Sequence, residues 1–412
     1  MQDVFYTSFM TSAIIIVICT LLLFAYFFDL TASRTRIPSV VLLLALGWAV
    51  RQLTNSFDIQ VPDLSASLPF LGTLGLILIV LDGTLELELN RSKLSVIKKS
   101  VIASVLQVLL LAFLLAAVFM YLLPHISLSD ALTNAIPLCV ISSAIAIPSA
   151  KHLSEGKREF ITYESSLSDI FGVVFFNFVA LNQLSESHST GESILQLLIM
   201  VAVSFVATIL LAFLLSKIEH HIKFIPIILS ILLIYSIAKY YHLPALIFIL
   251  IFGLFLGNLD ELKRFVWIEK LKVDALNVEV HKFKGLNAEA TFLVRALFFL
   301  LFGFLIETRE IINTATLPWA IGIVAVVLLL RAIQFRLFKI SMFPMLFIAP
   351  RGLINILLFL SIVPAQNIPL VNKSLLLQVI LLSALTLMFG LMFSGKKDEE
   401  AIKNKNESTI LF

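Results

Sequence analysis

Two carboxylates and three hydroxyls lie within six residues of each other inside an apolar stretch. The segment reads Glu164-Ser-Ser-Leu-Ser-Asp169, and the run around it, Phe160–Leu181, is otherwise mostly apolar. A charged side chain at the centre of a bilayer costs on the order of 2.5–3.5 kcal/mol even on the lenient insertion scale. Acidic residues kept at that cost are candidates for binding a cation or a proton.

Helical spacing divides this segment into two faces. At about 100° per residue, Ser165 and Ser166 share a face with Asp169 because they precede it by four and three positions. We expect these oxygens to form half of a shell around a monovalent cation. Glu164 and Ser168 share a face that is rotated away from Asp169, so we expect Glu164 to meet a basic partner.

Two arginines in later apolar runs, Arg331 and Arg351, are the potential partners of Glu164. A guanidinium keeps its charge in any protein environment and needs an anion or carbonyl groups beside it. We predict a structural ion pair between Glu164 and one of the two, and the spacing leaves open which one. Asp169 is then the carboxylate that remains free to titrate.

Other polar residues in apolar runs carry less information. Arg295 has three interpretations: a side chain that reaches to the interface, a helix cap, or a functional residue. Asn355 is a second possible site residue or a contact between helices. Asp82 and Glu86 end a run and are interpreted as interfacial.

The composition identifies the class of protein. The 412 residues are 59% hydrophobic and 14% charged, with a mean hydropathy of +1.02, whereas soluble domains are about 25% charged. A net charge of +3 is too small to indicate nucleic-acid binding. Cys19 and Cys139 lie in apolar runs and are interpreted as free thiols. Neither a His/Cys metal pattern nor a Gly-rich phosphate loop occurs, so we expect no cofactor.

A membrane-spanning helix needs roughly 20 apolar residues. We find thirteen candidate runs, of which the second and ninth are short: Ser8–Phe28, Ile37–Val50, Leu68–Leu85, Val101–Leu123, Ala131–Ala150, Phe160–Leu181, Ile194–Leu215, Ile222–Ala238, Pro244–Gly257, Ala290–Ile306, Leu317–Phe335, Phe343–Val363 and Leu375–Phe393. We interpret the first as a retained span rather than a signal peptide. Lys and Arg concentrate in alternate loops, which predicts an external N-terminus and a cytoplasmic C-terminus in the cell membrane.

An internal repeat relates the two halves of the chain. Leu74–Glu88 and Leu297–Glu310 each end an apolar run with a glycine and acidic residues, in the third and tenth runs. An offset of seven spans inverts the direction of crossing, and inverted repeats are typical of secondary transporters. The sequence therefore predicts an all-α polytopic membrane protein with two inverted six-helix repeats and a linker helix.

The fifth and twelfth runs contain helix-breaking residues at matching positions of the repeat. Pro148 lies in the fifth, after Ser142 and Ser143, whereas Pro350 and Gly352 bracket Arg351 in the twelfth. Irregular backbone at membrane depth is tolerated only around a polar cavity. We therefore predict that both helices are broken and cross at the midplane, beside the acidic segment.

These motifs together resemble those of the monovalent cation:proton antiporters of the sodium/proton exchanger type. The matching residues are Glu164-Ser-x-Leu-x-Asp169 with Gly172, Thr35–Pro38 with Gly47, Phe292–Phe299, Arg331 and Pro350–Asn355. The resemblance implies a homodimer in a lipid membrane. It also implies that Asp169 binds the cation and the proton, and that Glu164 pairs with Arg331 or Arg351.

The resemblance further implies a division into domains. Residues 1–90 would hold dimerisation helices 1–3, and 97–182 would hold core helices 4–6. Residues 193–306 would hold the linker and dimerisation helices 7–10, with a cytoplasmic segment at 260–285 that is either an interfacial helix or a tether. Core helices 11–13 would occupy 316–395, and 396–412 would form a short cytoplasmic tail.

Two departures from the family pattern affect the cation site. Ser168 stands where the family usually has asparagine, and the stretch Ser142–Pro148 lacks the acid of a Thr-Asp-Pro motif. We expect backbone carbonyls freed by the break, with the Ser142 and Ser143 hydroxyls, to take the place of the missing ligand. The predicted cation and proton site is thus Asp169, Ser165, Ser166, Ser168, Ser142 and Ser143.

With one titrating carboxylate, a cation and a proton compete for the same group. This predicts electroneutral exchange of one Na⁺ for one H⁺ by alternating access. Exchange of K⁺ or Li⁺, or ion-coupled transport of a solute on the same plan, is the alternative. A membrane enzyme or a sensor that does not transport is a third hypothesis, although we find no aspartate cluster of the kind that diphosphate-using transferases need.

Overall fold

The computed structural model describes residues 2–35, 37–87, 89–90, 93–184, 190–217, 224–241, 245–263 and 273–410, and these ranges contain helices and no strand. The helices are α1 (Gln2–Thr35), α2 (Ser39–Ser56), α3 (Ser67–Glu86), α4 (Leu94–Leu122), α5 (Leu128–Ala135), α6 (Ser143–Ser149), α7 (Glu155–Leu184), α8 (Thr190–Lys217), α9 (Phe224–Tyr240), α10 (Leu246–Gly257), α11 (Leu259–Leu262), α13 (Val273–Phe304), α14 (Thr308–Ile311), α15 (Leu317–Leu337), α16 (Leu353–Leu360) and α17 (Lys373–Ile410). Short 3-10 turns are η2 (Ile136–Leu138), η3 (Met345–Phe347) and η4 (Pro364–Gln366).

Eight segments among the described residues are long and apolar enough to cross a membrane. Other predicted spans fail that test for visible reasons: α9 and α10 have 17 and 12 residues, and the twelfth run is interrupted between η3 and α16. α7 carries the buried acidic segment within its 30 residues. The prediction of an all-α polytopic membrane protein is confirmed.

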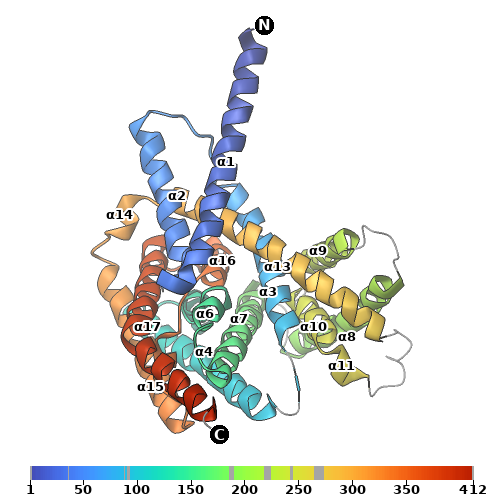
Figure 1. Cartoon of the computed structure of the whole chain (residues 1–412). Coiled ribbons are helices and arrows are strands. Elements are labelled where there is room, and N and C mark those ends of the chain that lie inside the picture. The colour runs from blue at the N-terminus through green and yellow to red at the C-terminus, as the bar shows by residue number, and fades with distance from the viewer. Residues whose placement is uncertain are drawn as a thin grey trace.

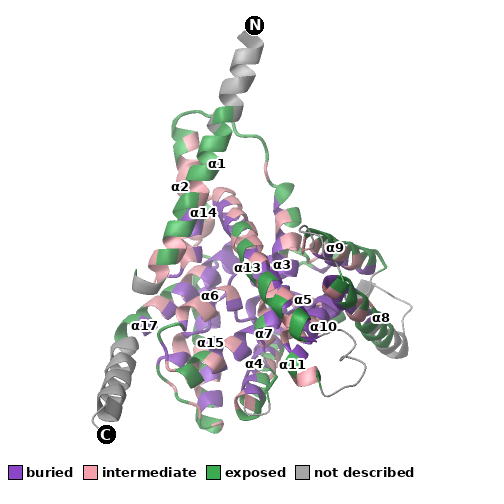
Figure 2. Ribbon diagram, turned by 45° about the vertical axis from the view of Figure 1, so that its right-hand side comes forward, coloured by how far each residue is buried: buried purple, intermediate pink, exposed green. Residues whose placement is uncertain are grey.

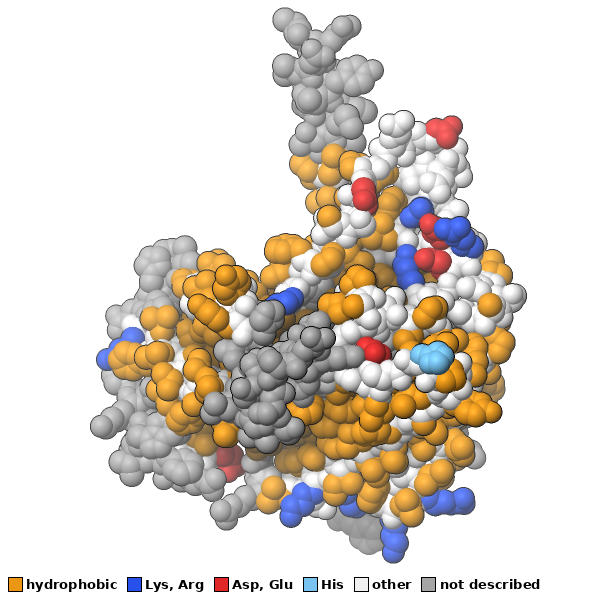
Figure 3. All heavy atoms as spheres, turned by 180° about the vertical axis from the view of Figure 1, so that it is seen from behind, with side chains coloured by type: hydrophobic (Ala, Val, Ile, Leu, Met, Phe, Trp, Pro, Cys, Tyr) orange, Lys and Arg blue, Asp and Glu red, His pale blue; other side chains and the backbone are white. Residues whose placement is uncertain are grey.

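The outer surface of the bundle is apolar. Large hydrophobic side chains such as Phe113 on α4, Val206 on α8, Leu233 on α9 and Leu329 on α15 are exposed. Figure 2 shows exposed residues along the outer faces of α1, α8 and α9, and Figure 3 shows apolar side chains over most of one face, with Lys and Arg gathered at its lower edge. This distribution suits a lipid solvent, in which apolar side chains on the outside cost nothing.

The helices pack in two groups. In the first, α13 lies against α2 and α3, and α10 lies against α3 and α8. In the second, α4 packs on α5 and α7, α15 packs on α17, and α6 packs on α7. Figure 1 shows α6, α7 and α16 between α15 and α17 on one side and α8–α11 on the other. The groups meet where α3 contacts α7 and α16.

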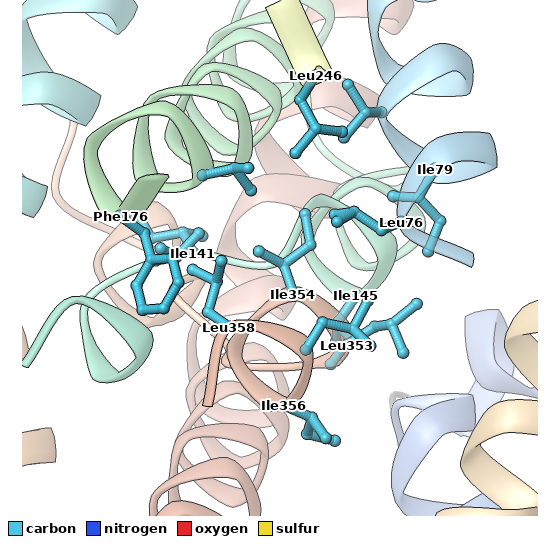
Figure 4. Packing of buried hydrophobic residues seen from close by; sticks show 14 of the residues in the cluster. Leu76, Ile79, Ile141, Ile145, Phe176, Leu246, Leu353, Ile354, Ile356 and Leu358 are labelled. Carbon is cyan, nitrogen blue, oxygen red and sulfur yellow. The ribbon is translucent and has the colours of Figure 1, made fainter. Parts of the chain in front are cut away.

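The junction between the groups is apolar. Leu76 and Ile79 of α3 and Leu246 of α10 come from the first group, and Leu353 and Ile354 of α16 come from the second (Figure 4). All five side chains are at least nine-tenths buried. At this junction the two groups touch through apolar side chains.

Glycines allow α2 and α13 to approach backbone to backbone. A Cβ placed on Gly47 would collide with the backbone of Leu300 and Phe304, and one placed on Gly303 would collide with the backbone of Leu44. Small residues at helix interfaces are the usual means of close packing in membranes, because lipid gives no hydrophobic drive for association. The glycine on each helix therefore sets the distance between α2 and α13.

Predicted boundaries differ from the structure at several helices, and two of the differences concern the predicted cytoplasmic segments. The tenth run is predicted to begin at Ala290, whereas α13 begins at Val273, so part of the predicted 260–285 segment is helical and continuous with the span. Residues 264–272 of that segment lie outside the described residues, as do Arg36, Arg91, Lys223 and residues 411–412 of the predicted tail. The backbone of the tail continues α17 to Ile410.

Replacing Gly303 by Ala should force α2 and α13 apart and destabilise the protein by about 1–3 kcal/mol, the usual cost of overpacking. Gly285→Ala is the matched control, because it lies on the same helix and a Cβ added there would meet no atom within 4 Å. Thermal unfolding in detergent measures both. A Gly303→Ala protein as stable as Gly285→Ala would contradict the backbone contact.

Candidate ion-binding site

Two interrupted helices touch at their breaks. Between η2 and α6 the chain is not helical at Val140–Ser142, and between η3 and α16 it is not helical at Ile348–Gly352. The Ser142 amide donates a hydrogen bond of 2.8 Å to the Pro350 carbonyl. Gly352 is required at this contact, since a Cβ there would lie 2.5 Å from the Ser142 hydroxyl oxygen.

The position of the fifth-helix break corrects the role predicted for Pro148. The non-helical residues precede α6, and Pro148 lies inside that helix as its sixth residue. Proline removes only the hydrogen bond that its own amide would make to the carbonyl four residues earlier. Near the end of a seven-residue helix this loss is local, so the helix continues for one more residue.

Side chains of the twelfth helix satisfy the backbone at the fifth-helix break. Asn355 Nδ2 donates to the carbonyls of Pro137 at 2.7 Å and Val140 at 2.9 Å. The Arg351 guanidinium donates to the carbonyls of Leu138 at 3.2 Å and Cys139 at 3.1 Å, and to that of Ala349 in its own segment at 2.6 Å. The sequence predicted that carbonyls freed by the break would serve as cation ligands; the four carbonyls from residue 137 to residue 140 each already accept a hydrogen bond.

Asp169 of α7 lies at the start of α6. Its Oδ2 accepts a 3.0 Å hydrogen bond from the Ser143 amide, and its side chain is 3% exposed. Its Oδ1 is buried and has no hydrogen-bond partner among the described residues. The carboxylate therefore keeps one oxygen available for a proton or a cation while the other anchors it to the break.

The serines near Asp169 do different things. The Ser166 Oγ is buried without a partner among the described residues, one turn before Asp169 on the same face. The Ser165 hydroxyl donates to the Ile161 carbonyl of its own helix at 2.7 Å. Ser168 Oγ accepts from the Ile141 amide at 3.0 Å and so ties α7 to the break. Ser142 is buried at the crossing itself.

Glu164 pairs with Arg331 and not with Arg351. The guanidinium of Arg331, on α15, makes two hydrogen bonds of 2.6 and 2.7 Å to the Glu164 carboxylate, and both side chains are at most 1% exposed. Its Nε donates to the Met345 carbonyl at 3.1 Å. The Phe335 ring lies 4.5 Å from the guanidinium carbon. This fork-to-fork geometry satisfies both charges, which a buried pair requires.

The sequence from residue 18 to residue 395 matches the family described as sodium/hydrogen exchanger, transmembrane. The chain belongs to the sodium/hydrogen exchanger family. The resemblance inferred from the motifs is confirmed, and the protein is a cation/proton antiporter of a transporter family rather than an enzyme.

Solved structures support the same fold for this exchanger. It is similar to the sodium proton antiporter MjNhaP1 from Methanocaldococcus jannaschii at pH 8, with a TM-score of 0.66 and 19% identity over 91% of this chain and 98% of that one. A three-dimensional electron-microscopy map of MjNhaP1 gives a TM-score of 0.63 and 18% identity over 93% and 95%. No curated protein sequence matches the chain.

In this exchanger Asp82 is more than the interfacial residue that its sequence position indicated. It lies on α3, is mostly buried, and accepts a 3.2 Å hydrogen bond from Asn287 Nδ2 on α13. Its neighbour Gly83 faces Ser166, whose oxygen would lie 3.5 Å from a Cβ. The signal in the sequence was the polar stripe Asn287, Thr291 and Arg295, spaced four residues apart where α13 passes from its charged first half into its apolar second half.

Arg295 is also placed by the structure. It donates to the Ala144 carbonyl of α6 at 3.4 Å and lies 3.5 Å from the Asp29 carboxylate of α1. Asp29 was not singled out from the sequence because it follows the end of the first apolar run, where an acid is common. Within the described residues no group of three or more His, Cys, Asp or Glu side chains is arranged to hold a metal ion.

Glu164→Gln should destabilise the exchanger by about 3–5 kcal/mol, because it leaves the Arg331 charge buried without its anion. The double variant Glu164→Gln with Arg331→Met should recover most of that loss, since neither charge then remains. Thermal unfolding in detergent, with size-exclusion chromatography, measures both.

Arg336→Met is the control, because Arg336 lies on the same helix as Arg331 but is exposed. If Glu164→Gln lost no more stability than Arg336→Met, the pair would not be the structural element that its geometry indicates.

Proposed function

We propose that the chain exchanges a monovalent cation, most readily Na⁺, for a proton at Asp169 by alternating access. The observation that carries the proposal is the unequal treatment of the two Asp169 oxygens. One is held by the Ser143 amide, and the other is buried beside the Ser166 hydroxyl with no partner among the described residues. A buried carboxylate in this state needs either a proton or a cation to offset its charge.

The contrast with Glu164 supports Asp169 as the exchange group. Glu164 has a bidentate arginine within 2.7 Å, so a cation that approached it would have to displace a fixed positive charge. Asp169 has an amide and hydroxyls near it, which are neutral. Of these two carboxylates, Asp169 can therefore change its charge state without leaving a second buried charge uncompensated.

One exchange carboxylate implies one cation for one proton. Because the site holds either species but not both, a complete cycle moves no net charge. The remaining oxygens of the proposed site are those of Ser165, Ser166, Ser168, Ser142 and Ser143. The same set can hold K⁺ or Li⁺, which differ from Na⁺ in size and not in charge, and the lack of a second acid favours no cation by charge alone.

We further propose that the second helix group is the core domain and the first is the dimerisation domain of a homodimer. Thirteen crossings in two inverted repeats, with an external N-terminus, follow from the pattern of runs and basic loops. The apolar junction between the groups supports the division. The groups meet at α3, α7 and α16 mainly through apolar side chains, a type of contact that lets one group shift against the other.

Asp169→Asn should abolish cation-driven proton movement in proteoliposomes containing a trapped pH dye, tested with Na⁺, K⁺ and Li⁺. Asparagine keeps the size of the side chain but has no exchangeable charge. Asp63→Asn is the control, because Asp63 lies in the exposed segment between α2 and α3. Proton movement by Asp169→Asn at the wild-type rate would place the exchange site elsewhere. No movement by wild type with any of the three cations would favour a sensor.

Turnover of the wild-type protein should not depend on membrane potential, because one cation and one proton carry equal charge across the bilayer in opposite directions. The measurement is the initial rate of Na⁺-driven proton movement in proteoliposomes held at zero and at inside-negative potential. A rate that changes several-fold with potential would mean that the cycle moves net charge, and that a second group titrates with Asp169.

A further inference from the structure

Arg295 connects three helices that no other part of the proposed mechanism connects. It lies on α13 and donates to Asp29 of α1 at 3.5 Å and to the Ala144 carbonyl of α6 at 3.4 Å. Asp29 is held in turn by the Ser39 hydroxyl of α2, which donates to the same carboxylate oxygen at 3.2 Å. The guanidinium thus joins the first helix group to the half-helix that begins at the exchange site.

Pro148 makes the Ala144 carbonyl available to Arg295. In a helix this carbonyl would accept from the amide four residues later, and residue 148 has no amide hydrogen. Ala144 also directly follows Ser143, whose amide holds Asp169. The hydrogen bond from Arg295 to the Ala144 carbonyl is therefore made to the same short helix, α6, that anchors the exchange carboxylate.

Residues next to both anchors of Arg295 line one crevice. Its lining includes Ser39, which donates to Asp29, with Ile37 and Pro38 before it, and Ala144, Ile145 and Ser149 of α6. The crevice has an empty volume of about 420 Å³, which includes space open to the outside. It lies beside the loops after the first and fifth spans, on the side that we propose to be cytoplasmic.

The contacts of Arg295 are long compared with those of Arg331. Charge-assisted hydrogen bonds are ordinarily about 2.7–2.9 Å, as in the Glu164–Arg331 pair at 2.6 and 2.7 Å. The two contacts of Arg295 measure 3.4 and 3.5 Å, and its side chain is 15% exposed, against 0% for Arg331. Arg295 can therefore exchange its partners for water, whereas Arg331 cannot.

We propose that Arg295 is a releasable tether at this crevice. Its hydrogen bonds hold α6 against α1 and α13, and they break when the crevice widens toward the cytoplasm. This positioning role rests on the proposed function, because it requires α6 to move with the core domain. The Asp29 carboxylate and the Ala144 carbonyl are the two anchors, and loss of either the guanidinium or the free carbonyl releases the tether.

The test measures how readily the crevice opens, independently of transport. In a full-length protein with Cys19→Ala and Cys139→Ala, Ile37→Cys, which lines the crevice just before α2, reports access to a membrane-impermeant maleimide in detergent. Arg295→Gln should raise its labelling rate several-fold, and Arg295→Lys should restore part of the wild-type rate. Pro148→Ala should raise the rate as well, because the new amide hydrogen-bonds Ala144 within the helix and removes the anchor without touching the charge.

Arg336→Gln, which changes an exposed arginine on α15, is the control and should leave the labelling rate unchanged. Wild-type labelling rates in both Arg295→Gln and Pro148→Ala would overturn the tether, whatever the transport assay shows. Raised labelling in a protein that moves no alkali cation against protons would leave the tether standing and overturn the proposed function. If Arg295→Gln does not elute as a folded protein, Pro148→Ala alone decides the outcome.

Discussion

Everything in the proposed site depends on how two broken helices satisfy their backbone inside the membrane. A break leaves amides and carbonyls without helical partners, and each costs several kcal/mol in hydrocarbon. Arg351 and Asn355 on one chain segment supply the donors for four carbonyls of the other. Asp169, Ser168 and the Pro350 carbonyl supply the acceptors for three of its amides. The break is stable because α7 and the twelfth helix together complete it.

This arrangement explains why Asp169 is both bound and available. The Ser143 amide needs an acceptor, and a carboxylate oxygen is a strong one, so folding itself places Asp169 at the crossing. The second carboxylate oxygen, Oδ1, has no hydrogen-bond partner among the described residues. In the proposed function, protonation or cation binding at that oxygen would leave the amide hydrogen bond in place, so the occupant would change while the crossing stays intact. The Glu164–Arg331 pair joins α7 to α15 nearby and gives α7 a rigid attachment.

Much of this was predictable from sequence, for physical reasons that apply residue by residue. The apolar runs identify the helices because bilayer thickness sets their length. The helical period of about 3.6 residues places Glu164 and Asp169 on different faces of α7. The choice between Arg331 and Arg351 was not predictable, because it depends on tertiary distance. Arg351 instead donates to carbonyls beside both breaks, those of Leu138 and Cys139 in the fifth helix and that of Ala349 in its own segment. The prediction that Pro148 marks the break was wrong, because proline removes one backbone hydrogen bond and a helix can lose one without ending.

The two departures from the family pattern bear on how few oxygens the protein can offer a cation. Ser168 stands in place of asparagine. Its hydroxyl oxygen already accepts a hydrogen bond from the Ile141 amide. The four carbonyls at the break each accept from Arg351 or Asn355, and the Ser165 hydroxyl donates within its helix. Asp169 Oδ1 and Ser166 Oγ remain as the two unengaged buried oxygens at the site among the described residues. Selectivity among alkali cations depends on the number and field strength of the ligands. With these two oxygens and the Ser142 and Ser143 hydroxyls, the proposed site would leave the ion part of its water, so we expect discrimination between Na⁺ and K⁺ to come from hydration rather than from a closed cage of protein oxygens.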